Sequence, residues 1–366
     1  MSLRQLRETP VPEGAEERAW EVARAAYEAR DPAPARRRSP LRPALALAAA
    51  VAAAGVLASP PGWSLIHSIR VAVGVKEAQT ELFSLPAPGR LLVVSQRGLW
   101  VVQRDGSRRL LGGYRDAAWS PHGLYLAATR PDEVVALDPK GQVRWTLPRP
   151  GARFPSWTGS FTDTRIAYVA AGRLHVVAGD GTGDHALGPA ATVAPAWRPG
   201  GGRVLAYATP RGLAVYDADR AAVLWSARGR PVRLEWSSDG ARLLARGPVG
   251  LQVFDARGRV VAEDDPSDAT HDADAAFVPG THRVAVIRVH GAQSDLFDLA
   301  TGRTLFRGTG AFGQVVAAPD GRWLLVTWPT ADQWVFVRAA GAPRIRAVAG
   351  IIRQLGPGVR VAGWCC

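Results

Sequence analysis

Cysteine is scarce in this sequence: the 366 residues hold two, Cys365 and Cys366, and they are adjacent. With no further pair elsewhere, no disulfide framework can tie the fold together. Adjacent cysteines can bridge to each other only through a strained ring, far from usual disulfide geometry. We therefore expect an untied tail that carries two free thiols. The alternative is an intermolecular disulfide in an oxidising compartment.

Motifs of the common catalytic and metal centres are also missing. The sequence has no G-x-S-x-G, H-E-x-x-H or Cys–His nucleophile pattern, and its seven histidines are scattered. We expect no catalytic, cofactor-binding or metal-binding residue, and therefore no enzyme.

Lysine is nearly absent, with only Lys76 and Lys140, so arginine carries most of the positive charge of a chain whose net charge is +13. A basic chain can bind nucleic acid or a membrane surface. Here the arginines are scattered through strand-like segments and turns, and the one tight run is Arg36–Arg38, with Arg42 close behind. Because nucleic-acid binding needs a clustered basic face, we expect no nucleic-acid partner.

Long hydrophobic runs are absent except for Pro43–Ala58, which has no charged or polar side chain. Counted over 41–62, this run reaches the roughly 17–25 residues of a membrane-spanning helix. About forty residues precede it, whereas a signal peptide has a short basic leader. We expect an uncleaved single-pass helix; cleavage after Ala58 and a buried soluble helix are the alternatives.

The flanks of this run set the expected topology. Arg36–Arg38 and Arg42 lie just before the span, so the positive-inside rule places the N-terminus in the cytoplasm and everything after Trp63 outside the cell (plasma) membrane. Residues 13–30 are rich in Ala, Glu and Arg and predict one short helix. The expected domains are a cytoplasmic segment at 1–40, a transmembrane helix at 41–62, a juxtamembrane linker at 63–80 and a further domain at 81–366.

A pattern of apolar strand, glycine-containing turn and second apolar strand recurs through that last domain. Its turns are centred near residues 88, 122, 162, 200, 239, 280 and 320, a spacing of roughly forty residues, which is the period of a four-stranded propeller blade. Each copy continues with a third strand, a second turn such as Asp-x-x-Gly that suits a tight hairpin, and a fourth segment. The sequence therefore predicts an all-β, seven-bladed β-propeller with four-stranded blades, preceded by a short N-terminal helix and one transmembrane helix.

The W-S-P-x-G turn at Trp119–Gly123, with strands such as Arg203–Thr209 (RVLAYAT), resembles the TolB-like and WD-repeat-like bacterial propellers. The resemblance covers residues 80 to about 350, although the WD dipeptide and the Gly-His signature are absent. The whole layout also resembles uncharacterised single-pass membrane-anchored propeller proteins of GC-rich bacteria. Such a resemblance implies the fold and leaves the function open.

One position of the repeat holds tryptophan in several copies. Aromatic side chains dominate core area, so we expect these residues to pack between blades, with aromatic ligand cages as the alternative. The position is occupied by Trp119, Trp157, Trp197 and Trp236, and later by Phe277 and Ala317.

The tail Gly350–Trp364 reads as one or two further strands, with Pro357-Gly358 as the turn between them. A ring of sheets leaves two edges to join. We therefore expect the tail to be a closing strand that pairs beside the first blade, near residues 82–95.

Three segments resemble ligand sites. Gly308–Gly313 (GTGAFG) matches G-x-G-x-x-G, but it lies between two strands instead of opening a helix, so no dinucleotide site is expected. Gly179–Asp184 (GDGTGD) could suggest calcium, but it falls where the repeat places a hairpin turn. The stretch 263–274 is the densest acidic one, and we expect a solvated loop; the alternative is that a hard cation is held by Asp268, His271, Asp272 and Asp274.

The expected function is that of a membrane-tethered extracytoplasmic propeller, a non-enzymatic binding or scaffolding module with a protein partner. One alternative is a transmembrane regulator whose segment 1–40 docks a protein partner through Trp20 and Tyr27. That layout resembles membrane anti-sigma factors without their zinc motif. A further alternative is a propeller hydrolase or lactonase.

Overall fold

The structure is a computed structural model that describes residues 84–366, except 161–162, 201 and 268. These residues belong to one compact unit, Ser64–Cys366. The expected helix at 13–30, the transmembrane helix at 41–62 and the linker at 63–80 lie outside the described residues. Within the described part of the chain, no helix is both long enough and apolar enough to span a bilayer.

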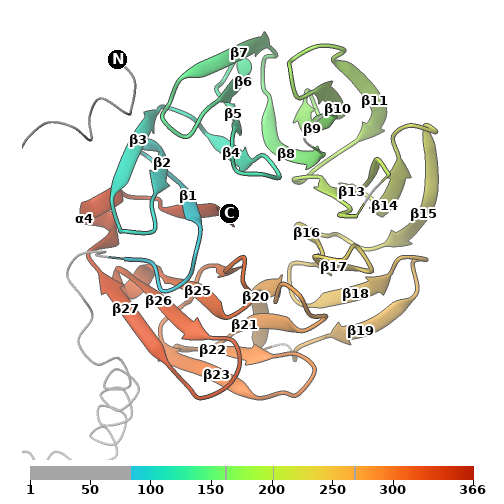
Figure 1. Ribbon diagram of the computed structural model, residues 1–366. Helices are drawn as coiled ribbons and strands as arrows, with labels where there is room; N and C mark the ends of the chain where they lie inside the picture. Colours follow the sequence, from blue (N-terminus) through green and yellow to red (C-terminus); the bar gives the residue numbers. More distant parts are fainter. Residues whose placement is uncertain (1–83, 161–162, 201, 268) are drawn as a thin grey trace, which may run out of the picture. The chain divides into compact units, whose positions relative to one another are not determined.

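Seven four-stranded antiparallel sheets form the blades of a ring (Figure 1), which confirms the predicted propeller. The strands of each blade are given from the centre of the ring outward. Blade 1 contains β28 (Arg360–Cys365), β1 (Arg90–Ser95), β2 (Gly98–Val102) and β3 (Arg108–Gly112); blade 2 contains β4 (Asp116–Trp119), β5 (Leu126–Thr129), β6 (Glu133–Leu137) and β7 (Val143–Pro148); blade 3 contains β8 (Arg153–Gly159), β9 (Thr164–Ala170), β10 (Arg173–Ala178) and β11 (His185–Ala190).

The remaining blades follow the same order. Blade 4 contains β12 (Ala196–Trp197), β13 (Val204–Thr209), β14 (Gly212–Asp217) and β15 (Ala222–Arg228); blade 5 contains β16 (Arg233–Trp236), β17 (Arg242–Arg246), β18 (Leu251–Asp255) and β19 (Val260–Asp264). Blade 6 contains β20 (Thr270–Phe277), β21 (Val284–His290), β22 (Gln293–Asp298) and β23 (Thr304–Thr309); blade 7 contains β24 (Val315–Ala317), β25 (Trp323–Trp328), β26 (Gln333–Arg338) and β27 (Ile345–Ala349). A 3₁₀ turn, η2 (Pro329–Ala331), and a short helix, α4 (Ile351–Leu355), complete the described elements.

In blades 2 and 5 an aspartate at or just after the end of the third strand holds the turn that follows it. Asp138 accepts the backbone N–H groups of Lys140 and Gln142, both at 2.9 Å, and Asp255 accepts those of Arg257 and Arg259 in the same way. These bonds add to the backbone hydrogen bonds inside the turn, such as those from Gly141 to Asp138 and from Gly258 to Asp255, and explain why aspartate recurs there.

The cores lie between neighbouring blades, because each twisted sheet covers the face of the next. All six side chains of β25 are buried, whereas the outer strand β15 alternates between exposed and half-buried positions. Between blades 7 and 1, Leu91 and Val93 of β1 pack with Trp334 and Phe336 of β26. This burial on both faces explains the continuous apolar runs of the middle strands.

The C-terminal tail closes the ring beside the first blade, as predicted. β28 pairs antiparallel with β1, with Leu91 opposite Trp364, and the indole N–H of Trp364 donates to the carbonyl of Pro88 at 3.1 Å. In the first copy of the repeat, residues 84–89 form no strand, so β28 supplies the innermost strand of blade 1. The tail therefore contributes one strand, and the possible second strand is wrong because α4 occupies 351–355.

The expectation of an untied tail with two free thiols is also wrong. Cys365 is part of β28 and pairs with Arg90, and a disulfide joins Cys365 to Cys366. The cysteines lie against the first turn of blade 2, with Cys366 Sγ 3.8 Å from the carbonyl of Pro121. Strand pairing, which the count of cysteines could not reveal, fixes this end of the chain.

Candidate functional site

The innermost strands end in the tryptophans of the repeat, which pack between blades as predicted. Trp119, Trp197 and Trp236 are buried. The indole N–H of Trp197 donates to the carbonyl of Ser156 in blade 3, and that of Trp236 donates to the carbonyl of Ala196 in blade 4, each at 3.1 Å. Each of these two rings is therefore anchored to the preceding blade.

Trp157 differs from these two residues. Its ring is only half-buried, and its indole N–H makes no hydrogen bond within the described residues. It packs among residues of blades 2 and 3 that include Ala127, Val134 and Ile166. Packing alone therefore holds this ring, and one part of it remains open to a cavity.

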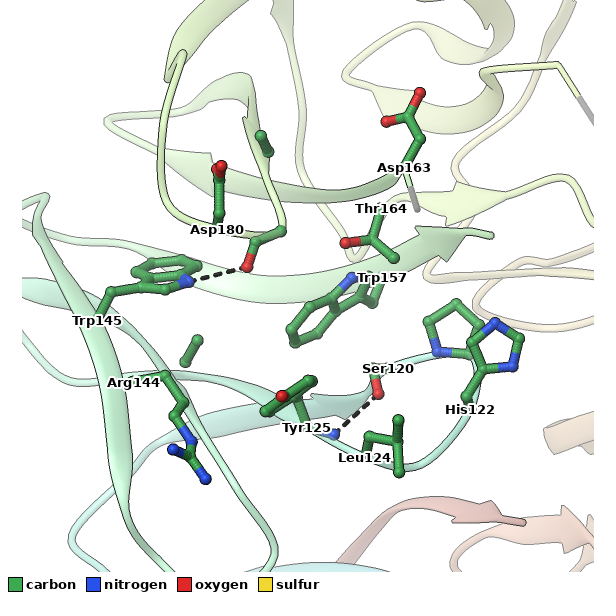
Figure 2. Close-up of a pocket in the computed structure, with 14 residues that line it drawn as sticks. Ser120, His122, Leu124, Tyr125, Arg144, Trp145, Trp157, Asp163, Thr164 and Asp180 are labelled. Atoms are coloured by element: carbon green, nitrogen blue, oxygen red, sulfur yellow. Dashed lines mark hydrogen bonds between the residues drawn. The ribbon is translucent and has the colours of Figure 1, made fainter. Parts of the chain in front are cut away.

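That cavity, of about 550 Å³, lies between blades 2 and 3. Figure 2 shows three aromatic side chains around it. Tyr125 directly precedes β5, Trp145 belongs to β7 and Trp157 belongs to β8. Leu124 and Tyr125 are 55% and 40% exposed, so much of their apolar surface is available to a ligand. The lining consists of Ser120, Pro121, His122, Leu124, Tyr125, Ala136, Arg144, Trp145, Trp157, Asp163, Thr164, Ala178, Gly179 and Asp180.

Local contacts fix the walls of this first cavity. The Ser120 hydroxyl accepts the backbone N–H of Tyr125 at 3.0 Å, which holds the turn, and the Trp145 indole donates to the carbonyl of Gly179 at 2.9 Å (Figure 2). Gly181 lies against the Trp145 ring: a Cβ there would come within 2.8 Å of it. The position requires glycine for a second reason, since its φ of +89° is disfavoured for other residues.

Two charged groups at the first cavity have different surroundings. Arg144 forms an ion pair with Asp138 at 3.0 Å and lies over the Tyr125 ring at 5.9 Å. The Asp180 carboxylate accepts the backbone N–H and the hydroxyl of Thr182, and these hydrogen bonds lower its pKa. Asp180 therefore remains a negative charge at the edge of the cavity, whereas Arg144 is neutralised by its partner.

A second cavity, of about 720 Å³, lies between blades 3 and 4. It shares Pro121, Trp157 and Asp163 with the first, so the two cavities are contiguous on one face of the ring. The turns that join the first strand to the second in blades 2, 3 and 4 contribute to both, and the first cavity is also lined by β6, by β7 and by the turn after β10. Its lining is Pro121, Trp157, Thr158, Gly159, Ser160, Asp163, Arg165, Trp197, Arg198, Pro199, Gly200, Gly202, Arg203 and Asp219.

Three arginines and two aspartates line the second cavity. Arg203 pairs with Asp163 and with Asp219, the latter at 2.7 Å, and Arg165 pairs with Asp163 at 3.3 Å. Arg198 is not part of this set: its Nε donates to the carbonyl of Gly240 at 2.7 Å, and its guanidinium lies 5.4 Å from the centre of the Trp236 ring. Its terminal nitrogens have no partner in the described chain, so they are available to an anion.

The structure corrects the interpretation of the acidic stretch 263–274. Asp272 and Asp274 are buried in strand β20 and do not belong to a solvated loop, whereas His271 is exposed and Asp268 lies outside the described residues. Both aspartates face arginines of blades 5 and 6 and form an ionic cluster with them. Among the described residues no group of three or more His, Cys, Asp or Glu side chains is placed to hold a metal ion.

Arginine contacts explain why these carboxylates are buried. Asp274 accepts Arg233 at 2.8 and 2.7 Å, and Asp272 accepts Arg288 at 3.0 Å, while Arg288 also pairs with Asp264. Burial, and next the charge of Asp264, raise the pKa of Asp272 to about 7, against the opposing effect of Arg288. The cluster therefore joins blades 5 and 6 and holds one carboxyl that titrates near neutrality.

The other two segments lie where the sequence placed them. Gly308–Gly313 runs from the end of β23 toward β24 and opens no helix. Gly179–Asp184 is the hairpin turn between β10 and β11, although it also contributes Gly179 and Asp180 to the first cavity. Sequence reasoning missed this cavity because its aromatic residues come from three separate segments, the one before β5, β7 and β8. One signal was present: Leu124 and Tyr125 are two large apolar residues directly after a Ser-Pro-x-Gly turn.

No family model matches this sequence, and no curated protein does. Among solved structures, it is similar to a chain of hydrazine synthase from Kuenenia stuttgartiensis, with a TM-score of 0.50, 18% identity and coverage of 62% of this chain and 77% of that one. It is similar to the Cps50 (Swd1) β-propeller domain of Myceliophteria thermophila, with a TM-score of 0.50, 15% identity and coverage of 66% and 94%. The Pan2 WD40 domain of Neurospora crassa aligns at a TM-score of 0.49, with 9% identity and coverage of 65% and 79%.

Identities this low show the fold alone. The fold is a β-propeller, like that of the Cps50 (Swd1) domain. This fold by itself leaves the function open, so the residues of the two cavities decide what they can bind.

Proposed function

We propose that this protein is a non-enzymatic binding module, and that it takes a protein partner on the face of the ring formed by the first turns of blades 2–4. The observation that carries the proposal is the pair of contiguous cavities on either side of Trp157, with volumes of about 550 and 720 Å³. In the first cavity Leu124 and Tyr125 are exposed and Trp157 is half-buried, so apolar surface is open to a ligand there. Exposed aromatic and aliphatic groups with a polar rim are typical of protein-binding surfaces.

We also propose that the propeller is tethered to the plasma membrane and lies outside the cytoplasm. The support is the apolar run at 41–62 with Arg36–Arg38 before it. The resemblance to TolB-like and membrane-anchored bacterial propellers points the same way. Protease added to intact spheroplasts should cleave the propeller and spare an N-terminal tag; loss of the tag instead would reverse the orientation.

The proposal of a binding module without catalysis rests on how the first cavity uses its polar groups. Ser120 carries a hydroxyl that could serve as a nucleophile, but this hydroxyl accepts the backbone N–H of Tyr125 and holds its own turn. A nucleophilic serine needs an activating base and an oriented acid. The full-length protein should therefore hydrolyse a panel of esters and lactones no faster than buffer. Turnover abolished by Ser120→Ala would favour the hydrolase alternative.

A site-specific crosslink tests the binding face directly. A photoreactive residue at position 124, which is 55% exposed, should give a protein adduct in cells. The matched control is position 249, 46% exposed on the loop between β17 and β18, which lies at the other end of the strands. An adduct at 124 and none at 249 supports the proposed face; equal adducts at both, or none at 124, would reject it.

A further inference from the structure

Building on the proposed function, we infer that the two cavities together bind an acidic peptide segment of the partner, with an aromatic side chain in the first cavity and a carboxylate on Arg198 in the second. The inference names the chemistry of the partner. It depends on the binding face proposed above, and its test separates the two.

Arg198 supplies the site for the carboxylate. Its Nε is bound to the carbonyl of Gly240 and its plane lies near Trp236, so the guanidinium is held in place. Because Nε is engaged, the two terminal nitrogens form the fork that remains, and such a fork matches the two oxygens of a carboxylate. The other two arginines of the second cavity are paired with Asp163 and Asp219, which leaves one uncompensated positive charge in its lining.

The first cavity supplies the site for an aromatic ring. Tyr125, Trp145 and Trp157 present aromatic surface from three directions, and Leu124 adds aliphatic surface at the rim. Aromatic rings prefer offset or edge-to-face neighbours, and several such contacts stabilise a buried ring beyond the area it covers. Asp180 also lines this cavity, and its carboxylate forms no ion pair among the described residues, although the charge of Arg165 acts on it. Its negative charge disfavours a carboxylate in the first cavity, whereas Arg198 attracts one in the second.

The arrangement fits a peptide better than a compact small molecule. The two binding groups lie in separate cavities on opposite sides of Trp157, so the ligand must pass over this ring and reach both. An extended peptide advances about 3.3 Å per residue, which lets two side chains a few residues apart reach neighbouring cavities. The net charge of +13 also favours approach by an acidic segment through long-range attraction.

The probe is a series of N-acetylated, C-amidated Gly/Ser peptides with one Phe and one Asp separated by one to four residues. Binding to the full-length protein is measured by calorimetry. At the best spacing, replacing Asp by Asn, or Phe by Ala, should each weaken binding about tenfold or more, the size expected for loss of a charge-assisted fork or a buried ring. 3-Phenylpropionate, which carries the same two groups without a chain, should bind far more weakly.

Two variants test which cavity binds the Asp and which binds the Phe of the peptide. Arg198→Gln should remove the preference for Asp over Asn and keep the preference for Phe over Ala. Leu124→Ser should reduce the preference for Phe and keep that for Asp. Arg259→Gln on blade 5, a side chain 73% exposed, and Leu110→Ser on blade 1, 46% exposed, make the same chemical changes away from the cavities and should leave both preferences intact.

Several results would overturn the inference. They are no preference for Asp or Phe at any spacing, an unchanged Asp preference in Arg198→Gln, an equal loss in Arg259→Gln, or 3-phenylpropionate binding as tightly as the peptide. If any of these results is found while the crosslink at position 124 is still observed, the proposed binding face stands and only the proposal of an acidic aromatic peptide is rejected. Absence of that crosslink rejects the proposed function itself.

Discussion

The innermost strands of the propeller are joined by different contacts in two regions of the ring. From blade 5 through blades 6 and 7 to blade 1, a side-chain oxygen accepts a backbone N–H of the next blade. The pairs are Glu235 with Phe277 (3.0 Å), Asp274 with Val315 (3.0 Å) and Gln314 with Val361 (2.9 Å). From blade 3 to blade 5, an indole N–H donates back to a carbonyl of the preceding blade, as in Trp197 and Trp236.

The change of contact follows the repeat position itself. Blades 2–5 have tryptophan there, whereas blades 6 and 7 have Phe277 and Ala317, which offer no indole N–H. Glu235 and Asp274 compensate by bonding the backbones of blades 6 and 7. At the junction of blades 2 and 3 neither contact is strong: Asp116 accepts the N–H of Phe154 at 3.3 Å, and Trp157 has no hydrogen bond among the residues described.

Three cavities lie in the part of the ring that lacks the short carboxylate and amide contacts. The two proposed to bind peptide lie between blades 2 and 3 and between blades 3 and 4, and a smaller one of about 320 Å³ lies between blades 4 and 5. The first lies at the junction where Trp157 makes no hydrogen bond among the described residues, and the other two lie at junctions joined by an indole N–H. One region of the ring is therefore joined by side-chain oxygens, and the other leaves space between its blades.

The largest expected effect comes from breaking the carboxylate region at Asp274. Asp274→Ala leaves Arg233 without its main partner and Val315 N–H without an acceptor, so we expect a loss of about 3–5 kcal/mol in the free energy of unfolding. Chemical denaturation measures it. Arg259→Ala, which breaks an exposed pair, should cost less than about 1 kcal/mol; similar losses in the two variants would contradict the distinction.

A smaller effect is expected from pH, through Asp272 in the same region. Burial raises its pKa to about 7, so between about pH 4 and 7 the native protein holds a proton that the unfolded chain has lost. This contribution to stability is complete at low pH and disappears as pH rises through 7. The free energy of unfolding of Asp272→Asn relative to wild type should therefore rise across that window, by at most about 4 kcal/mol. A difference that stays flat from pH 4 to 8 would remove the proposed titration.

The smallest expected change in the free energy of unfolding concerns the indole hydrogen bonds. Trp236→Phe removes the N–H that bonds the carbonyl of Ala196 and should cost about 1–2 kcal/mol. Trp157→Phe removes an N–H that makes no such bond and should cost clearly less, although both changes remove similar ring area. Thermal or chemical denaturation of the pair decides the matter, and equal losses would show that the hydrogen bond is not what separates the two positions.

Much of the fold was available from local sequence. The period of the Gly-containing turns gives the seven blades, because each turn needs residues that tolerate positive φ. The turns depend on residues close together in the chain, which a single sequence displays. The pairing of the tail with β1 joins distant residues, and it was predictable only because a ring of sheets must cover the edge of its first strand.

The rest depends on which residues meet across blades. Asp272 and Asp274 look like a solvated loop until Arg288 and Arg233 are placed opposite them. Arg198 becomes a candidate anion site only because, within the described chain, Arg165 and Arg203 pair with aspartates and Arg198 does not. The first cavity draws Tyr125 from the segment before β5, Trp145 from β7 and Trp157 from β8. No local pattern carries these juxtapositions.

The closing strand has a consequence for the order in which the propeller folds. In blades 2–7 every strand pairs with a neighbour in sequence, whereas the Trp364–Pro88 contact of blade 1 joins residues 276 positions apart. Contacts of long sequence separation form late, because the entropy of closing so large a loop must be offset by contacts already made. We therefore expect blade 1 to complete the domain last. Until it does, the edge of β1 is an unpaired strand that another chain can occupy.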